Sequence, residues 1–185
     1  MNSTFEMQEL DMEGVKLITP FYMEDDRGFF LKSVERDIYR QWGLNADIYE
    51  DFESYSTKGV IRGLHFQLEK PQTKIVRVIK GAIRDVIVDL RKDSETYGKW
   101  VGVILSERNM KQMYISEGFA HGFKVLSDTA KFCYKVTDFY HPNDEGGIAW
   151  NDPDIGIEWP EPEIEPVLSD KDTKWPHFKD IFVNV

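Results

Sequence analysis

Residues 74–90 read KIVRVIKGAIRDVIVDL, and this stretch decides the fold class. It is rich in β-branched residues on both sides of Lys80-Gly81, a pair of the kind that joins two strands in a tight hairpin. Two strands are therefore expected, at 74–79 and 82–90, with a turn between them.

Other segments of the same character are expected to be strands, at 15–19, 59–66, 100–105, 111–115 and 131–137. One helix is expected at 33–42, because Val34, Ile38 and Trp42 recur at helical spacing and Gly43 follows as a stop signal. Many short strands separated by turn signals predict an all-β sandwich or barrel with a few short helices.

The composition excludes several classes of protein. With 185 residues, a single domain over 1–185 is expected. Lys and Arg number 23 against 33 Asp and Glu, and the net charge of −10 argues against binding to nucleic acid or to an anionic membrane surface. No apolar run approaches the ~20 residues of a membrane-spanning helix. The single cysteine, Cys133, and the lack of a signal-peptide pattern favour a cytoplasmic location.

The acidic residues are unevenly distributed. Residues 141–165 contain eight acidic residues and no Lys or Arg, and most of the prolines lie in or beside this stretch. Because proline cannot donate to a sheet ladder, 141–185 is expected to be a loop-rich cover that flanks the barrel without defining its chemistry.

Two histidine segments carry candidate chemistry. His65 lies in RGLHFQ, inside a predicted strand, where Arg62 is expected on one face and His65 and Gln67 on the other. His121 lies in GFAHGF, interpreted as a glycine-bracketed turn that lets the backbone pass close to another group. A small β-barrel with two such segments is typical of a cupin.

Metal-binding cupins carry a second histidine two positions after the first, and Gln67 occupies that position here. Because glutamine is a poor ligand for zinc or iron, no metal is expected, and a metal-dependent cupin enzyme is the less favoured alternative. A cup that holds His65, Lys74 and Tyr134 instead suggests proton transfer, with a base, an oxyanion stabiliser and an acid.

A series of motifs then recurs in order along nearly the whole chain, at 25–30, 58–67, 72–76, 85–91, 118–123, 134–140 and 168–172. Together they resemble the dTDP-4-dehydrorhamnose 3,5-epimerase family of deoxysugar biosynthesis. The resemblance implies a homodimeric jelly-roll cupin without metal or redox cofactor, whose N-terminal segment takes part in dimer contacts. The implied substrate is a nucleoside-diphospho-4-keto-6-deoxyhexose, in nucleotide-sugar and polysaccharide biosynthesis.

The resemblance also implies residue roles. His65 would abstract a proton beside the 4-keto group, with Asp172 orienting its imidazole. Tyr134 would return a proton from the opposite face, and Lys74 would stabilise the enolate oxygen. Arg62 would bind the diphosphate. Further contacts around the substrate are implied for Gln67, Asp85, His121, Tyr140, Arg27, Phe30, Glu50 and Phe52.

Two segments that meet the nucleoside in this family depart from its pattern. Glu50-Asp51-Phe52 stands where Gln-Asp-Asn is usual, and Lys32 replaces a glutamate. The nucleotide is therefore left open among dTDP, CDP, GDP and UDP. The alternatives are an epimerase that inverts only C3 or C5, one that acts on a 4-keto-heptose, and a non-catalytic cupin that binds a sugar nucleotide.

Overall fold

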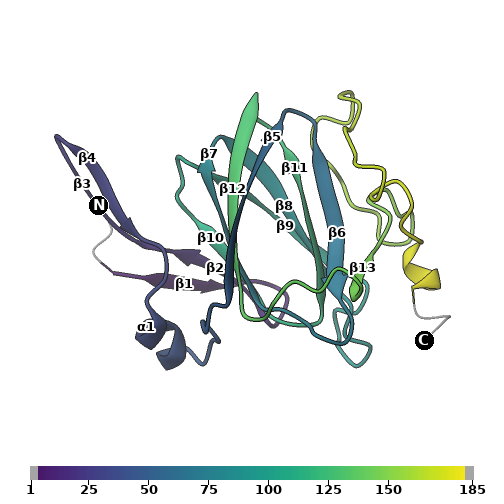
Figure 1. Cartoon of the computed structure of the whole chain (residues 1–185), viewed down its shortest axis with the longest axis horizontal. Helices are drawn as coiled ribbons and strands as arrows, with labels where there is room; N and C mark the ends of the chain where they lie inside the picture. The colour runs from purple at the N-terminus through teal and green to yellow at the C-terminus, as the bar shows by residue number, and fades with distance from the viewer. Residues whose placement is uncertain (1–3, 182–185) are drawn as a thin grey trace.

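The computed structural model describes residues 4–181 and confirms an all-β fold. Two antiparallel sheets form the barrel, and a two-stranded hairpin projects from one side (Figure 1). The six-stranded sheet has the order β1-β2-β10-β7-β12-β5, and the five-stranded sheet has the order β13-β6-β11-β8-β9. Apolar side chains from both sheets fill the space between them, as expected for a cupin-type jelly roll.

The six-stranded sheet is built from β1 (Glu6–Glu9), β2 (Val15–Thr19), β10 (Gln112–Ile115), β7 (Lys74–Lys80), β12 (Thr129–Val136) and β5 (Glu50–Thr57). The five-stranded sheet is built from β13 (Glu145–Gly147), β6 (Ile61–Gln67), β11 (Phe119–Val125), β8 (Ala82–Asp89) and β9 (Trp100–Ser106). All the strands expected from the sequence are present, with ends that shift by at most two residues.

The hairpin expected at 74–90 is wrong, because β7 and β8 do not pair with each other. β7 pairs with β10 and β12, whereas β8 pairs with β11 and β9. Gly81, at φ 82°, turns the chain from one sheet into the other, and a Cβ there would lie 2.1 Å from the carbonyl oxygen of Thr129. The two strands therefore meet face to face, and Val76 and Ile87 share one buried cluster.

Helix α1 (Arg36–Gln41) is shorter than the predicted 33–42. It begins at Arg36 because Glu35 is extended, and the chain turns away at Gly43, where φ is 73°. Tyr39 of α1 is fully buried and belongs to a cluster with Ile75 and Tyr114. The helix thereby covers part of the outer face of the six-stranded sheet.

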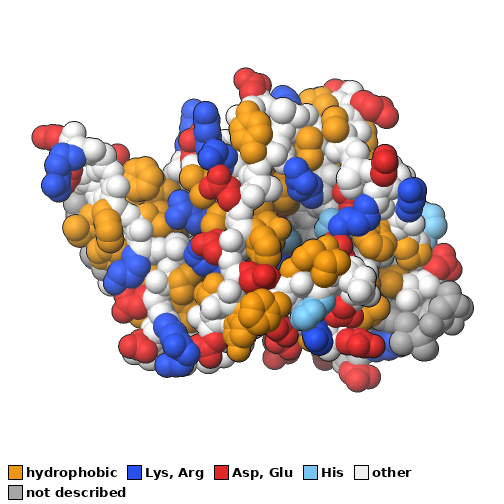
Figure 2. Space-filling model, in the orientation of Figure 1, with side chains coloured by type: hydrophobic (Ala, Val, Ile, Leu, Met, Phe, Trp, Pro, Cys, Tyr) orange, Lys and Arg blue, Asp and Glu red, His pale blue; other side chains and the backbone are white. Residues whose placement is uncertain are grey.

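A projecting arm is formed by β3 (Phe21–Asp25) and β4 (Gly28–Lys32), which pair only with each other. It extends from the barrel at the upper left of Figure 1. Phe29 and Phe30 are exposed by 58% and 61%, and apolar side chains are visible along this arm in Figure 2. Neither strand was expected from the sequence.

The C-terminal cover, residues 141–181, is loop-rich as predicted, with only β13 and a 3-10 helix, η1 (Phe178–Asp180). It packs on a second apolar cluster through Ile148 and Ile155. Val167 of the cover also forms an isolated parallel β-bridge with Val60. Within residues 4–181, no helix is long and apolar enough to cross a membrane.

Candidate active site

A pocket of about 550 Å³ lies within the barrel, between the two sheets and the C-terminal cover. Such a volume is large enough for a small-molecule ligand. The predicted site residues that line it are Phe52, Arg62, His65, Gln67, Lys74, His121, Tyr134, Tyr140 and Asp172. The pocket therefore gathers residues from β5, β6, β7, β11, β12 and the cover.

His65 and Arg62 both line the pocket, so the expectation that they occupy opposite faces of their strand is wrong. His65 is in register with His121, but Arg62 is in register with Phe123, which means that β6 carries one extra residue over this interval. This bulge resets the alternation of side chains. Gly63 lies at the irregularity, and a Cβ on it would lie 2.5 Å from the Cα of Gly122.

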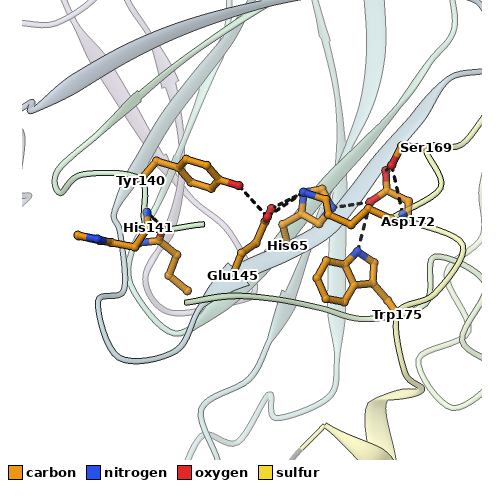
Figure 3. Close-up of polar contacts among 9 residues, drawn as sticks. His65, Tyr140, His141, Glu145, Ser169, Asp172 and Trp175 are labelled. Atoms are coloured by element: carbon orange, nitrogen blue, oxygen red, sulfur yellow. Dashed lines mark hydrogen bonds and ion pairs between the residues drawn. The ribbon is translucent and has the colours of Figure 1, made fainter. Parts of the chain in front are cut away.

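The imidazole of His65 pairs with the buried carboxylate of Asp172, and Nε2 lies 2.5 Å from Oδ1 (Figure 3). The hydroxyl of Ser169 donates to Oδ2 of Asp172 over 2.8 Å, and the indole N–H of Trp175 donates to Oδ1 over 3.3 Å. Burial alone would raise the pKa of Asp172, but the contacts with His65, Ser169 and Trp175 hold it below its usual value. Asp172 is therefore an ionised acceptor.

Glu145 is a pocket residue that the sequence did not single out. Its carboxylate accepts hydrogen bonds from the Lys171 ammonium and the Tyr140 hydroxyl, each over 2.8 Å. Its Oε1 lies 3.7 Å from Nδ1 of His65. Glu145 belongs to the acidic segment 141–165, so the expectation that this segment only flanks the barrel is wrong. No local pattern distinguishes this carboxylate from its acidic neighbours.

Lys74 of β7 reaches the same pocket. Burial disfavours its ammonium form and lowers its pKa to about 8, although the carboxylates of Glu145 and Asp85 act in the opposite direction. At neutral pH the side chain is therefore a cation held in a poorly solvated place, where it interacts strongly with a developing negative charge.

His121 lies within strand β11, so its interpretation as part of a turn is wrong; only Glu117 and Gly118 form the turn before that strand. β11 is buried along its whole length, which removes the alternation that marks a strand. Nε2 of His121 lies 2.7 Å from Oδ1 of Asp85, a fully buried residue of β8. Asp85 does not line the pocket itself, but it contacts the pocket residue His121 and its charge acts on Lys74.

Tyr134 enters the pocket from β12, in the sheet that faces His65. Its ring stacks on Phe52 of β5 with the ring centroids 5.0 Å apart. Burial raises the pKa of the Tyr134 phenol, which keeps it protonated at neutral pH. For Tyr140, burial and the neighbouring Glu145 raise the pKa to about 12.

Besides Asp85, three predicted contacts lie outside the pocket lining. Glu50 accepts a hydrogen bond from the backbone N–H of Tyr140 over 2.7 Å and so positions that residue. Arg27 and Phe30 lie on the projecting arm, where Arg27 pairs with Asp25 and Phe30 packs edge-on against Phe21. Among the residues that the structure describes, none from the arm lines the pocket.

Gln67 forms hydrogen bonds with the backbone of two loops beside the pocket. Its amide nitrogen donates to the carbonyl of Lys70 over 2.7 Å, and its oxygen accepts from the backbone N–H of His141 over 2.7 Å. In the part of the chain that the structure describes, no group of three His, Cys, Asp or Glu side chains is arranged to hold a metal ion.

A jelly roll whose cup holds a histidine–aspartate pair, with a lysine and a tyrosine in reach, is typical of the cupin-type carbohydrate epimerases, which are isomerases. The family model described as dTDP-4-dehydrorhamnose 3,5-epimerase matches residues 9–180. The chain therefore belongs to the dTDP-4-dehydrorhamnose 3,5-epimerase family.

Individual relatives agree with this assignment. A dTDP-4-dehydrorhamnose 3,5-epimerase from Methanothermobacter thermautotrophicus is 48% identical over 92% of this chain and 93% of its own. The crystal structure of the Legionella pneumophila enzyme with dTDP-4-keto-L-rhamnose matches with a TM-score of 0.92 and 43% identity, over 96% of this chain and 94% of that one. A 3′-monoepimerase from Streptomyces bikiniensis, in complex with dTDP-quinovose, matches with a TM-score of 0.87 and 33% identity, over 92% and 87%.

Proposed function

We propose that this protein inverts C3 and C5 of a nucleoside-diphospho-4-keto-6-deoxyhexose by removing and returning protons beside the keto group. One observation carries the proposal. His65, paired with Asp172, and Tyr134 line one pocket from opposite sheets, so a base and an acid are available on two sides of a bound sugar.

In the first step, His65 takes the proton from the carbon next to the 4-keto group. The electron pair of the broken C–H bond forms the enolate, whose oxygen is stabilised by the Lys74 ammonium. The imidazolium that forms on His65 is stabilised by the ionised carboxylate of Asp172. Residues with these properties are needed because a C–H group next to a ketone remains a weak acid in water.

In the second step, the Tyr134 phenol gives its proton to the same carbon from the other side, which inverts the centre. Its raised pKa supports this role, since the residue is held as the protonated acid at neutral pH. Repetition at the second carbon requires that His65 loses its proton and Tyr134 regains one between the two inversions.

The diphosphate is assigned to Arg62, whose planar guanidinium suits bidentate binding of phosphate oxygens. The Arg62 side chain lines the pocket yet remains exposed, and its Nε donates to the Ser56 hydroxyl over 3.0 Å. His121, Tyr140 and Gln67 complete the cup around the sugar.

Two copies of the chain are proposed to associate as a homodimer. The exposed apolar surface of the β3–β4 arm supports this, because Phe29 and Phe30 remain exposed by 58% and 61%. The arm would then bring Arg27 and Phe30 to the nucleoside bound by the partner. Phe52, which stands where the family usually has Asn, would contact the base. Glu50, which stands where the family usually has Gln, would act through Tyr140, whose backbone it binds.

Residues 1–185 are proposed to act as one cupin-type domain in the cytoplasm, without metal or redox cofactor. The acidic composition supports a small anionic substrate bound in a locally basic cup over any nucleic acid partner.

Deuterium wash-in tests the function directly. The protein is incubated in D₂O with 4-keto-6-deoxyhexoses linked to dTDP, CDP, GDP and UDP, and exchange at each carbon is followed by NMR. Exchange at both C3 and C5 is expected, with the preferred nucleotide showing the fastest rate. Exchange at C3 alone would identify a single-centre epimerase like the Streptomyces bikiniensis relative, and absence of exchange with every substrate would reject the epimerase function.

A further inference from the structure

We propose that Glu145 is a positioning residue for His65, and that Lys171 tunes it. The carboxylate stands beside Nδ1 and stabilises the imidazolium that forms when this nitrogen takes a proton. Lys171 weakens that stabilisation, because its ammonium offsets part of the charge of Glu145. The role assigned to His65 rests on the proposed function, whereas the coupling among the three side chains does not.

The hydrogen bond to Asp172 fixes which nitrogen of His65 is basic. Because the pKa of Asp172 is lowered, its carboxylate is ionised and only accepts, so Nε2 must carry the imidazole proton. The lone pair of the neutral ring is therefore on Nδ1. This nitrogen is the one that faces Glu145, a residue of the pocket wall.

The separation between Nδ1 and Oε1 of Glu145 is 3.7 Å, which is beyond hydrogen-bond range. At this distance the carboxylate does not occupy the lone pair, which stays available to a substrate C–H. A charge only 3.7 Å away still interacts strongly with the N–H cation that proton transfer creates. Glu145 thus favours the product of the proton transfer over its starting state.

Glu145 is held where it can act on His65. Tyr140 donates to Oε2 over 2.8 Å (Figure 3), and Lys171 donates to both carboxylate oxygens over 2.8 Å each. Burial would raise the pKa of the Glu145 carboxyl, but these contacts and the charge of His65 keep it below its usual value. Its side chain is only 12% exposed, so water screens the interaction with His65 weakly.

Other charged or titratable groups face His65 from every element around it. They are Arg62 on its own strand, His121 on β11 with Asp85 behind it on β8, Lys74 on β7, Tyr134 on β12, Tyr140 before β13, and Asp172 with Lys171 in the cover. Among residues 4–181, Glu145 is the only carboxylate that forms an ion-pair contact with Nδ1 of His65. Its effect is therefore separable from that of Asp172, which acts at Nε2.

The test is an NMR titration of the four imidazoles in the ligand-free protein, with His65→Asn used to assign the His65 signal. In Glu145→Gln, the midpoint of the His65 titration should move to lower pH by about one unit. In Lys171→Gln, it should move to higher pH, because Glu145 loses the cation that offsets its charge. The double variant should titrate like Glu145→Gln.

A matched control exists on the outer face of the barrel, where Glu53 and Lys131 form an ion pair over 2.9 Å. Glu53→Gln and Lys131→Gln make the same chemical changes away from the pocket and should leave the His65 midpoint in place. If Glu145→Gln moves the midpoint no more than Glu53→Gln does, the proposal is overturned. If Glu145→Gln does not fold, a Lys171→Gln midpoint that stays in place or falls overturns it equally.

The acid limb of the kcat/KM profile for epimerisation should shift with the imidazole in both variants. A rise in KM alone, with the limb unchanged, would make Glu145 a substrate contact and reject the positioning role. Failure of the wild-type protein to exchange deuterium into any substrate would reject the proposed function instead, while the titration would still decide the coupling of Glu145 to His65.

Discussion

Two imidazole–carboxylate pairs lie side by side in this barrel, since His65 and His121 are register partners on β6 and β11. In one pair, His121 meets Asp85 from the adjacent strand β8, so the sheet supplies both members. In the other, His65 meets Asp172 from the C-terminal cover, so the pair forms only when the cover docks on the barrel.

The surroundings of the two carboxylates differ as well. Asp85 is fully buried, and no hydrogen-bond partner of its Oδ2 is present among the described residues. Both oxygens of Asp172 are engaged, by Ser169 and Trp175 in addition to His65. A carboxylate whose two oxygens are both hydrogen-bonded has a fixed orientation and is suited to orient a reacting imidazole. A buried carboxylate with one unpaired oxygen is better suited to a structural role in the barrel interior. The His65–Asp172 pair is therefore expected to act in catalysis, and the His121–Asp85 pair to stabilise the barrel.

The largest expected effect comes from removing His65, the imidazole that pairs with Asp172 of the cover. His65→Ala should lower the rate of deuterium exchange by roughly 10²–10⁴-fold, because a positioned general base contributes about this much. The melting temperature should stay close to that of wild type, since the ring faces a pocket. An exchange rate near that of wild type would remove His65 from the role of base.

Asp172→Asn should rank next. It keeps the shape of the side chain but removes the charge that stabilises the imidazolium, and a loss of about 10²-fold or more in kcat is expected. The corresponding change Asp85→Asn should cost less activity. Steady-state kinetics of the two variants decides the comparison, and equal losses would mean that both pairs take part in the chemistry.

The ionisation of Lys74 is expected to set the alkaline limb of the kcat/KM profile. Its pKa of about 8 predicts that kcat/KM falls tenfold for each pH unit above that value, as the ammonium is lost. The folded pKa lies below the ~10.4 of an unfolded lysine, so between these two values the folded chain binds fewer protons than the unfolded chain. Across this interval the contribution of Lys74 to the free energy of unfolding therefore increases as pH rises. The alkaline loss of activity should therefore precede any loss of structure by circular dichroism. A Lys74→Arg variant should move the limb to higher pH.

The smallest expected effect concerns stability. Asp85→Asn should lower the free energy of unfolding by about 1–3 kcal/mol, because it changes a buried hydrogen-bonded group with no access to water. Asp172→Asn, at the edge of the pocket, should change it by less. Urea denaturation of both variants measures the difference, and the reverse order would contradict the division between a structural and a chemical pair.

Strands were predictable wherever an apolar core lies on one side, as at β2, β7 and β9. β5 was missed because its pocket-facing side chains include Ser54 and its other face carries Asp51 and Glu53, so neither face is uniformly apolar. β3 and β4 were missed because they lie outside the barrel, where no core imposes alternation. The crossing at Gly81 was read as a hairpin because local composition fixes the turn but not the sheet that each strand joins.

The site was predictable where motif and chemistry coincide, as for His65, Tyr134 and Lys74. Glu145 was missed because its importance comes entirely from distant partners, Lys171 and His65, that only the folded chain brings together. The face of Arg62 was missed for a different reason, since a bulge at Gly63 changes the alternation without any change in hydrophobic pattern.

The assembly of the cup from barrel and cover has a consequence for the order in which the protein acquires its properties. All strands except β13 precede residue 141, whereas Glu145, Lys171 and Asp172 follow it. A chain synthesised from its N-terminus thus makes the strands of both sheets, β13 excepted, before the carboxylates that flank His65. Because cover residues also line the pocket, the site is complete only after the last of these segments, residues 169–172, has been made and has docked on the barrel.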